Sequence, residues 1–411
     1  MIKIYDMETL EEREILFRGG SGADVSAPVA EILRAVQERG DAALREYTLR
    51  FDGAAPDALA VTAEEVDQAA AQVEPAFLAV LEEAAEHIRA YHARQKRESF
   101  VMTEREGVVL GQRIIPLARV GIYVPGGTAA YPSTVLMNAI PARIAGVGEI
   151  IMVTPPGRDG AVNPHILAAA KIAGVTRIYK VGGAQAVAAL AYGTGTIPQV
   201  DKIVGPGNAY VAEAKRQVFG RVNIDMIAGP SEVLVLADGR SNPAWVAADL
   251  LSQAEHDRMA AAVLVTDSRP LAEAVAHELE RQLAALPRAE IARASLEANG
   301  KLIVCRDLRE GIAVANRIAP EHLELCVDNP FDYLGEIQNA GSVFLGRYNP
   351  EPMGDYFAGP NHTLPTMGTA RFYSPLSVDD FVKKSQFSYY TRDALARDYR
   401  KVSLFARKEG L

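Results

Sequence analysis

An acid and a base stand side by side in the segment RIAPEHLEL, residues 317–325, where Glu321 directly precedes His322. A histidine can accept and release a proton near neutral pH, and a neighbouring carboxylate can activate water. The pair could therefore serve an oxidation in which His322 takes the proton of an alcohol and Glu321 activates a water. A structural explanation is also complete, because Pro320 suits the first turn of a helix and Glu321 is favoured near a helix start. Spacing alone does not choose between the two.

Two further polar residues could hold a metal in the segment DLLSQAEHD, residues 249–257. The pattern predicts a helix that begins near Asn242, in which Gln253 and His256 are three residues apart and share a face. An imidazole nitrogen and an amide oxygen on one face could bind zinc, although glutamine is an unusual zinc ligand. These nine residues alone favour a helix end in which His256 bonds a carbonyl and Glu255 faces solvent.

The segment MGDYFAGPNHTLPT, residues 353–366, combines Asp355 and His362 with several glycines and prolines. Loops of this kind are often functional. Asp355 could complete a metal site with a carboxylate oxygen, or it could serve as a helix cap or a turn residue. For His362, a structural hydrogen bond is favoured over a metal bond. His87 and His92 lie on a polar, charged stretch and are predicted to be solvated.

The elements that must position these residues change in character along the chain. The first hundred residues follow the spacing of amphipathic helices, including a long pattern capped by Thr62 and only locally disturbed by Pro75. From about residue 117, short apolar runs alternate with helical segments, which predicts a mainly parallel sheet with helices on both faces. After residue 370 the pattern is helical again.

Four loops rich in glycine and proline punctuate the alternating region. Ligands of open α/β sheets bind where strands end and loops turn into helices, so these loops are candidate ligand contacts, although turn chemistry is favoured for any single one. No G-x-G-x-x-G opens a helix, so the standard dinucleotide fingerprint is missing and composition alone does not suggest a nicotinamide cofactor. The four loops are VPGGTAAYPS, VGGAQA, VGPGNAY and AGPSE.

Length and composition bound the class of protein. A chain of 411 residues exceeds one ordinary core, so two or more domains are expected. The net charge of −9 argues against broad binding to nucleic-acid backbones, and nothing in the sequence suggests a membrane partner. The N-terminal segment lacks the apolar core of a signal peptide. The two cysteines, Cys305 and Cys326, are too few for a disulfide framework, and we expect a cytoplasmic protein.

Taken together, these motifs resemble those of the histidinol dehydrogenase family through most of the chain. The combination of IDMIAGPSEVLV with DLLSQAEH at this separation is highly specific. The other shared segments are ERGDAALREYTLRFDG, GIYVPGGTAAYPSTVLMNAIPA, VGGAQAVAALAYGT, VGPGNAYVAEAKRQV, APEHLEL and GDYFAGPNHTLPT.

The resemblance implies an NAD-dependent, four-electron oxidation of L-histidinol through L-histidinal to L-histidine, the last two steps of histidine biosynthesis. It implies one zinc ion per subunit, which would hold and orient the substrate. The alcohol step needs a base for the hydroxyl proton while hydride leaves for NAD, and this role falls to His322. The aldehyde must first add water, and Glu321 would activate that water.

Residue by residue, the resemblance extends to the ligands. It implies that the zinc ligands are Gln253, His256 and Asp355. It implies that an incomplete Rossmann-like domain contacts NAD through Tyr123, Gln185 and Asn208. The positions that match substrate contacts are Ser231, Gln253, His256, Glu321, His322, Asp355 and Glu409. The incomplete Rossmann-like domain accounts for the missing glycine fingerprint.

The implied fold is α/β, with two incomplete Rossmann-like parallel-sheet domains in tandem, a helical N-terminal segment, and small C-terminal helical segments exchanged in a homodimer. In the family, a histidine past the EGL pattern completes the zinc site of the neighbouring subunit. No histidine follows His362 here, so the fourth ligand is expected to be water, substrate or a residue beyond Leu411. The expected ranges are 1–110 for the N-terminal helical region, 111–240 for the NAD-binding domain, 241–370 for the second α/β domain with zinc and catalytic residues, and 371–411 for the helical dimerisation segment.

Three rival functions remain on sequence grounds. A paralogous zinc- and NAD-dependent dehydrogenase of another small polar alcohol would differ around Ser231, Asp355 and the C-terminal substrate contacts. The matches at Ser231 and Glu409 rank it below histidinol. A non-catalytic ligand-binding protein of the same fold is expected to have lost Glu321 or His322. A zinc hydrolase would leave the residues at the NAD positions unexplained.

Overall fold

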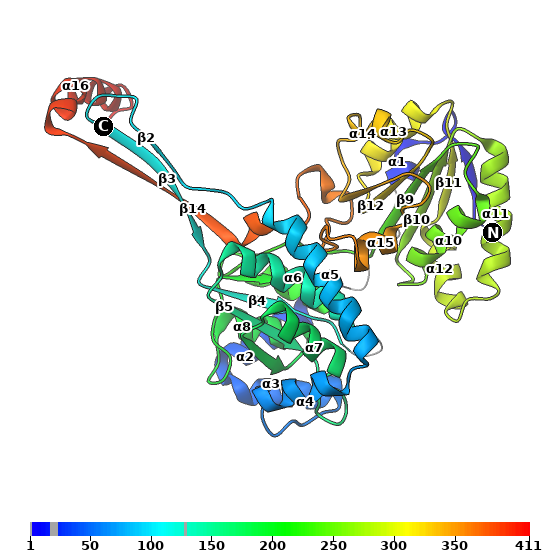
Figure 1. The fold of residues 1–411 in the computed structure, drawn as a ribbon, viewed down its shortest axis with the longest axis horizontal. Helices are drawn as coiled ribbons and strands as arrows, with labels where there is room; N and C mark the ends of the chain where they lie inside the picture. Colours follow the sequence, from blue (N-terminus) through cyan, green and yellow to red (C-terminus); the bar gives the residue numbers. More distant parts are fainter. Residues whose placement is uncertain (1, 17–23, 127–129) are drawn as a thin grey trace.

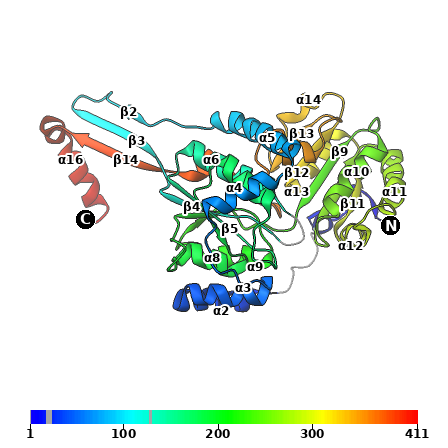
Figure 2. The same cartoon turned by 60° about the horizontal axis from the view of Figure 1, so that its bottom comes forward.

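The structure is a computed structural model that describes residues 2–16, 24–126 and 130–411. Figures 1 and 2 show two α/β lobes and a long arm that projects from one of them. The predicted α/β class with parallel sheets is confirmed. Within these residues no helix is both long and apolar enough to cross a membrane.

The first lobe is built on a five-stranded parallel sheet with the strand order β6-β5-β4-β7-β8. Alternate side chains of the central strands point to opposite faces, and each face is covered by helices that contribute its own buried cluster. The strands are β4 (Arg119–Tyr123), β5 (Glu149–Thr154), β6 (Arg177–Lys180), β7 (Lys202–Val204) and β8 (Asn223–Ile224). One face carries α4 (Ala63–Gln72), α5 (Pro75–Ala93), α6 (Pro132–Ala145) and α7 (Pro164–Ala173). The other carries α2 (Ser26–Arg39), α3 (Asp41–Asp52), α8 (Gly183–Tyr192) and α9 (Ala209–Val218).

The second lobe is built on a six-stranded parallel sheet with the order β1-β11-β10-β9-β12-β13. Its strands are β1 (Ile4–Asp6), β9 (Glu232–Ala237), β10 (Ala261–Thr266), β11 (Lys301–Val304), β12 (His322–Cys326) and β13 (Ser342–Leu345). One face packs on α10 (Pro243–Ala254), α11 (Arg269–Leu283) and α12 (Ala289–Asn299). The other packs on α1 (Glu12–Leu16) and α13 (Leu308–Ile318). Two short helices, α14 (Phe331–Leu334) and α15 (Glu351–Tyr356), follow β12 and β13.

The arm consists of a three-stranded antiparallel sheet and the last helix (Figure 1). Its elements are β2 (Phe100–Met102), β3 (Val108–Pro116), β14 (Val382–Tyr390) and α16 (Arg392–Lys408), preceded by the 3₁₀ turns η1 (Thr369–Arg371) and η2 (Val378–Phe381). Ala394 is the single buried residue of α16, while its apolar side chains Leu395, Leu404 and Phe405 are exposed. The arm therefore leaves an apolar helix face uncovered.

Two expectations for local structure are wrong. The pattern after the confirmed Thr62 cap is two helices, because Val73 and Glu74 are extended and Pro75 opens α5. A proline disfavours helix in the residue before it and cannot donate to the preceding turn. His92, predicted to be solvated, is fully buried, and its Nδ1 bonds the side chain of Gln95.

At three places the elements differ from the ranges expected from the sequence. The strands β1 and β9 lie in the six-stranded sheet, although one belongs to the expected N-terminal helical region and the other to the expected NAD-binding range. The region after residue 370, expected to be helical, contains the nine-residue strand β14. Because β14 pairs with β3 and its side chains are mostly exposed, its sequence carries no core alternation.

A buried ion pair in the first lobe predicts an unusually large mutational effect. Lys215 pairs with Asp225, and both side chains are almost fully buried around the loop that contains Gly205. Asp225→Asn leaves an uncompensated buried ammonium, so we expect a loss of about 3–5 kcal/mol of stability. As a control, Asp67→Asn in the exposed pair with Lys171 should cost at most about 1 kcal/mol. Calorimetric unfolding of both variants checks this, and equal losses would contradict it.

Candidate active site

Glu321 and His322 lie at the amino-terminal end of β12, and both are buried. The predicted helix start after Pro320 is wrong. Helix α13 ends instead at Ile318. The next residue, Ala319, takes a left-handed conformation, and the chain then turns into a strand. The segment His322–Cys326 is buried on both faces of a parallel sheet, and this burial competes with the helix preference of its first residues.

The backbone of Glu232, the first residue of β9, holds both side chains of the pair. Its N–H donates to Oε2 of Glu321 at 2.8 Å, and its carbonyl oxygen lies 2.9 Å from Nδ1 of His322. Because a carbonyl can only accept, Nδ1 carries the proton. The other ring nitrogen, Nε2, is buried and has no hydrogen-bond partner among the described residues.

Two carboxylates of α15 face that nitrogen. Nε2 of His322 lies 3.8 Å from Oε1 of Glu351 and 3.7 Å from Oδ1 of Asp355. One potential ligand atom from each of these three residues lies within 4.8 Å of the others, so the group could hold a metal ion. The sequence analysis missed Glu351. Its position four residues before Asp355, which puts both on one face of a helix, was the available signal.

The electrostatics of this cluster follow from its burial and its excess of acids. Burial raises the pKa of Glu321 to about 7 and, with the charge of Asp355, raises the pKa of Glu351 to about 8. Burial opposes a charge on His322, but the surrounding carboxylates outweigh it and raise the pKa of the imidazole to about 10. Burial also opposes a charge on Asp355, but the adjacent imidazoles of His322 and His362 outweigh it and lower the pKa of this carboxyl to about 2. The excess of buried carboxylates therefore favours a positive charge within the cluster.

Gln253 and His256 lie at the end of α10. Gln253 is buried in the last turn, and its Oε1 has no hydrogen-bond partner in the described part of the chain. His256 lies two residues past the helix, so the prediction that it shares a helix face with Gln253 is wrong. Its backbone N–H still donates to the carbonyl oxygen of Gln253 at 3.2 Å. Burial lowers the pKa of His256, while the nearby charge of Asp355 acts in the opposite direction. A neutral imidazole is the form that binds metals.

Three other predicted positions differ in how the structure places them. His362 bonds the carbonyl oxygen of Asp355 through Nδ1 at 3.0 Å, which confirms the expected structural hydrogen bond. Its Nε2 lies 3.5 Å from Oγ1 of Thr134 on α6, so this contact joins the two lobes beside the cluster. Ser231 directly precedes β9 and lies at the same sheet edge as Glu232. Glu409 caps the exposed end of α16 on the arm, away from the cluster of its own chain (Figures 1 and 2).

The residues at the NAD positions all follow strands of the five-stranded sheet. Tyr123 ends β4, and its hydroxyl accepts the N–H of Gly183 at 3.0 Å. Gln185 is buried in α8, and neither amide atom has a hydrogen-bond partner within the described ranges. Asn208 caps α9, with its side-chain oxygen accepting two backbone N–H groups of the first turn.

The four glycine-rich loops do not share one sheet edge. VGGAQA and VGPGNAY follow β6 and β7, whereas AGPSE precedes β9 of the other sheet and thus lies at its amino-terminal edge. VPGGTAAYPS follows β4, and its residues 127–129 lie outside the described ranges. Of the four candidate loops, AGPSE therefore lies apart, between β8 of one sheet and β9 of the other.

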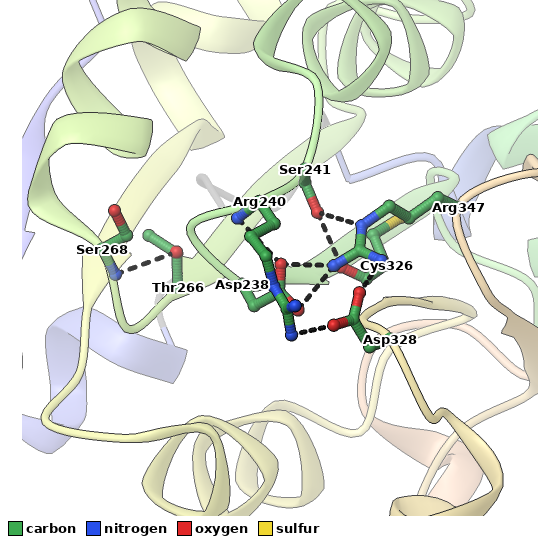
Figure 3. A network of polar contacts seen from close by, with 8 residues as sticks. All are labelled: Asp238, Arg240, Ser241, Thr266, Ser268, Cys326, Asp328 and Arg347. Carbon is green, nitrogen blue, oxygen red and sulfur yellow. Dashed lines mark hydrogen bonds and ion pairs between the residues drawn. The ribbon is translucent and has the colours of Figure 1, made fainter.

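Charged side chains close the opposite, carboxyl-terminal edge of the six-stranded sheet (Figure 3). The guanidinium of Arg347 bonds Asp238 after β9 at 2.5 and 2.6 Å and also bonds Asp328 after β12. Arg240 pairs with Asp328 as well, and Arg347 Nε lies 3.3 Å from Oγ of Ser241. Ligands of α/β sheets usually bind at this edge, but here protein side chains occupy it.

Two parallel sheets joined beside a buried acid–base pair, with amide and imidazole atoms that lack partners among the described residues, define a two-lobed α/β enzyme. The chain belongs to the histidinol dehydrogenase family, a family of oxidoreductases, whose model matches residues 18–411. It is 58% identical over 402 residues to the histidinol dehydrogenase of Geobacter sulfurreducens (strain ATCC 51573 / DSM 12127 / PCA), covering 97% of this chain and 93% of the relative.

Two further comparisons agree with this assignment. The histidinol dehydrogenase of Listeria monocytogenes serotype 4b (strain F2365) is 54% identical over 404 residues, covering 98% of this chain and 94% of the relative. The crystal structure of histidinol dehydrogenase from Elizabethkingia anophelis is 40% identical, with a TM-score of 0.95, and the match covers 100% of this chain and 95% of that chain.

The partly buried carboxyl of Asp52, at the end of α3, should make the stability of the folded protein depend on pH. Its Oδ2 is buried without a hydrogen-bond partner among the described residues, and burial raises the pKa of the carboxyl to about 6. A raised carboxyl pKa means that ionisation destabilises the folded state, so stability is lost as the pH rises from about 4 through 6. Because Asp52 is partly exposed, we expect Asp52→Asn to gain about 1 kcal/mol at pH 8 and less at pH 5.

Thermal unfolding at the two pH values tests this expectation. Asp57→Asn, in the exposed segment that follows, is the control and should change little at either pH. An equal gain for Asp52→Asn at pH 5 and pH 8 would show that ionisation is not the cause.

Proposed function

We propose that this protein oxidises L-histidinol through L-histidinal to L-histidine in the cytoplasm, with two molecules of NAD as hydride acceptors, as the last steps of histidine biosynthesis. Family membership supports the dehydrogenase role. The observation that carries the proposal is the buried pair at the start of β12, with Nε2 of His322 unpartnered among the described residues and 3.7 Å from Asp355.

The residues around His322 fit a zinc ion. The Oε1 atom of Gln253 is buried and unpartnered within the described chain, His256 is held neutral by burial, and the carboxylate of Asp355 has its pKa lowered to about 2. An amide oxygen, an imidazole nitrogen and a carboxylate oxygen are all donors that zinc accepts. We propose these three residues as the ligands, with Glu351 as a neighbouring carboxylate. A bound zinc ion would supply positive charge that orients the imidazole and amine of the substrate.

His322 would act as the general base through Nε2. Its Nδ1 proton is fixed on the carbonyl of Glu232, so Nε2 is the nitrogen that exchanges a proton. The carboxylates of α15 raise the pKa of the imidazole to about 10, and the positive charge of a bound zinc ion would offset them and free Nε2 to accept a proton. In the first oxidation, the hydroxyl proton would pass to Nε2 while the carbon-bound hydrogen leaves as hydride to NAD. A positioned base of this kind contributes about 10²–10⁴-fold to a rate.

Glu321 would serve the second oxidation. The N–H of Glu232 holds Oε2, and burial raises the pKa of this carboxyl to about 7, which suits proton transfer near neutral pH. Glu321 would take a proton from the water that adds to the aldehyde carbon. The carbonyl oxygen would take back the proton that His322 gained in the first step, which gives a neutral hydrate and restores His322 as a base. The hydrate is again an alcohol, so His322 would take its hydroxyl proton while a second NAD accepts the second hydride.

For NAD we propose the carboxyl-terminal edge of the five-stranded sheet, with contacts from Tyr123, Gln185 and Asn208. Gln185 supports this, because both its amide atoms are buried and unpartnered within the described chain. Gly205 lets the loop after β7 pack closely on Tyr123, because a Cβ there would lie 2.2 Å from the carbonyl oxygen of Tyr123.

We further propose a homodimer in which Glu409 of each chain reaches the substrate of the other. Within one chain Glu409 lies on the projecting arm, and the apolar side chains of α16 are exposed. A second copy packed on α16 would bury that face and bring the carboxylate to the cluster.

Substitutions at His322 and Glu321 should impair different parts of the reaction. His322→Ala should lower the rate of histidinol oxidation by about 10²–10⁴-fold while zinc content is kept, because the base is lost and the proposed ligands are not. Glu321→Gln should impair oxidation of histidinal more than that of histidinol. NADH formation from each substrate and metal analysis test both variants. His277→Ala, on the exposed surface of α11, is the control, and wild-type rates in both variants would refute the assignment.

A shared site predicts complementation between two inactive variants. In a heterodimer of one His322→Ala chain and one Glu409→Gln chain, one site would carry both defects and the other none. We therefore expect about half of wild-type activity per heterodimer, although each homodimer is impaired. Co-production with two different affinity tags isolates the heterodimer for assay. Activity equal to the mean of the two homodimers would show that Glu409 serves its own chain.

A further inference from the structure

A second pair of acids lies behind the candidate metal cluster, and the proposed mechanism does not use it. Glu324 is in the middle of β12, only 1% exposed, and two residues from His322, so both side chains leave the same face of the strand. Asp249 is on α10, one turn before Gln253 on the same helix face. The two carboxyls are hydrogen-bonded to each other, and burial raises the pKa of Glu324 to about 9.

Glu324 also reaches a third element. Its Oε1 accepts the backbone N–H of Glu351, the first residue of α15, at 2.8 Å. The residue before that helix is Pro350, which has no side-chain acceptor, so no local cap forms and Glu324 supplies the acceptor from the sheet. The contact fixes the turn of helix that carries Glu351 and Asp355.

One chain of hydrogen bonds, Asp249 to Glu324 to the N–H of Glu351, thus crosses α10, β12 and α15. These three elements carry Gln253, Asp355 and the proposed base His322, and His256 follows α10. The carboxyls of Asp249 and Glu324 are engaged with each other and with the backbone of Glu351, so we assign them a role that acts through other side chains.

We propose that Asp249 and Glu324 form a positioning pair, which holds α10, β12 and α15 at the spacing that the metal ligands require. The proposal rests on the zinc site put forward above. Zinc tolerates only small errors in ligand distance, and outer partners of metal ligands typically change metal affinity by about 10–100-fold when they are lost.

Two substitutions at Glu324 distinguish the effect of side-chain volume on zinc affinity from the effect of hydrogen bonding. Glu324→Gln keeps an oxygen for the N–H of Glu351 and gains an amide donor for Asp249, so its zinc Kd should stay within about threefold of wild type. Glu324→Leu keeps a similar volume but breaks both contacts, so its zinc Kd should rise by about 10–100-fold. The Kd is measured by competition with a chelator after metal removal. At saturating zinc, Glu324→Leu should regain most of its histidinol oxidation.

A second variant and a control keep the test decisive. Asp249→Leu, at a partly buried helix position, removes the far end of the same chain and should also weaken zinc binding if Glu324→Leu does not fold. The zinc Kd of the double variant should not exceed that of the single variant that binds zinc less tightly, because both substitutions act through one chain of contacts. Thr266→Val removes a buried polar contact at the other edge of the same sheet. It should leave the zinc Kd unchanged even where it lowers the unfolding temperature.

The outcomes distinguish this proposal from the proposed function. Wild-type zinc affinity in both leucine variants would overturn the positioning role while leaving the dehydrogenase intact. Equal loss in Glu324→Gln and Glu324→Leu would also overturn it, because the carboxylate itself would then be a ligand. If instead the wild-type protein binds no zinc and forms no NADH from histidinol, the proposed function fails.

Discussion

The parallel pairing of β12 with β9 is the constraint on which the candidate site depends. It sets His322 opposite Val233 and brings the backbone of Glu232 against the side chains of Glu321 and His322. A peptide group in a sheet is a rigid anchor, and its two polar atoms here hold a carboxylate and an imidazole at once. The side chains of Glu321 and His322 are therefore each held in a fixed orientation, which adjacent residues in a flexible loop would lack.

The two sheets use opposite edges. The residues at the proposed NAD positions follow the strands of the five-stranded sheet, as expected for ligands of α/β proteins. The acid–base pair and Ser231 instead precede strands of the six-stranded sheet, whose carboxyl-terminal edge is filled by the network around Arg347 (Figure 3). The ion pairs there satisfy the groups that a ligand would otherwise meet. In our proposal, a similar fold thus serves cofactor binding in one lobe and chemistry in the other.

The arm has a different character from the lobes. Most side chains of β14 are exposed, and α16 buries only Ala394. A helix with an exposed apolar face gains little stability from its own chain, since most helical stability in proteins comes from packing. This is the physical ground on which we propose a second copy as its partner, and it agrees with the position of Glu409 far from its own cluster (Figure 1).

Local sequence chemistry by itself determined the alternation of short strands and helices after residue 117, the helix caps at Thr62 and Asn242, and the candidates Glu321 and His322. These features depend on residue type and on short spacing. Sequence did not show that Pro75 separates two helices, that His92 is buried or that β9 pairs in the second sheet. It also missed Glu351 and the pair of Asp249 and Glu324, because contacts between α10, β12 and α15 join residues far apart in the chain. Only tertiary packing decides which carboxylates are buried next to one another, and this shared burial shifts their pKa values.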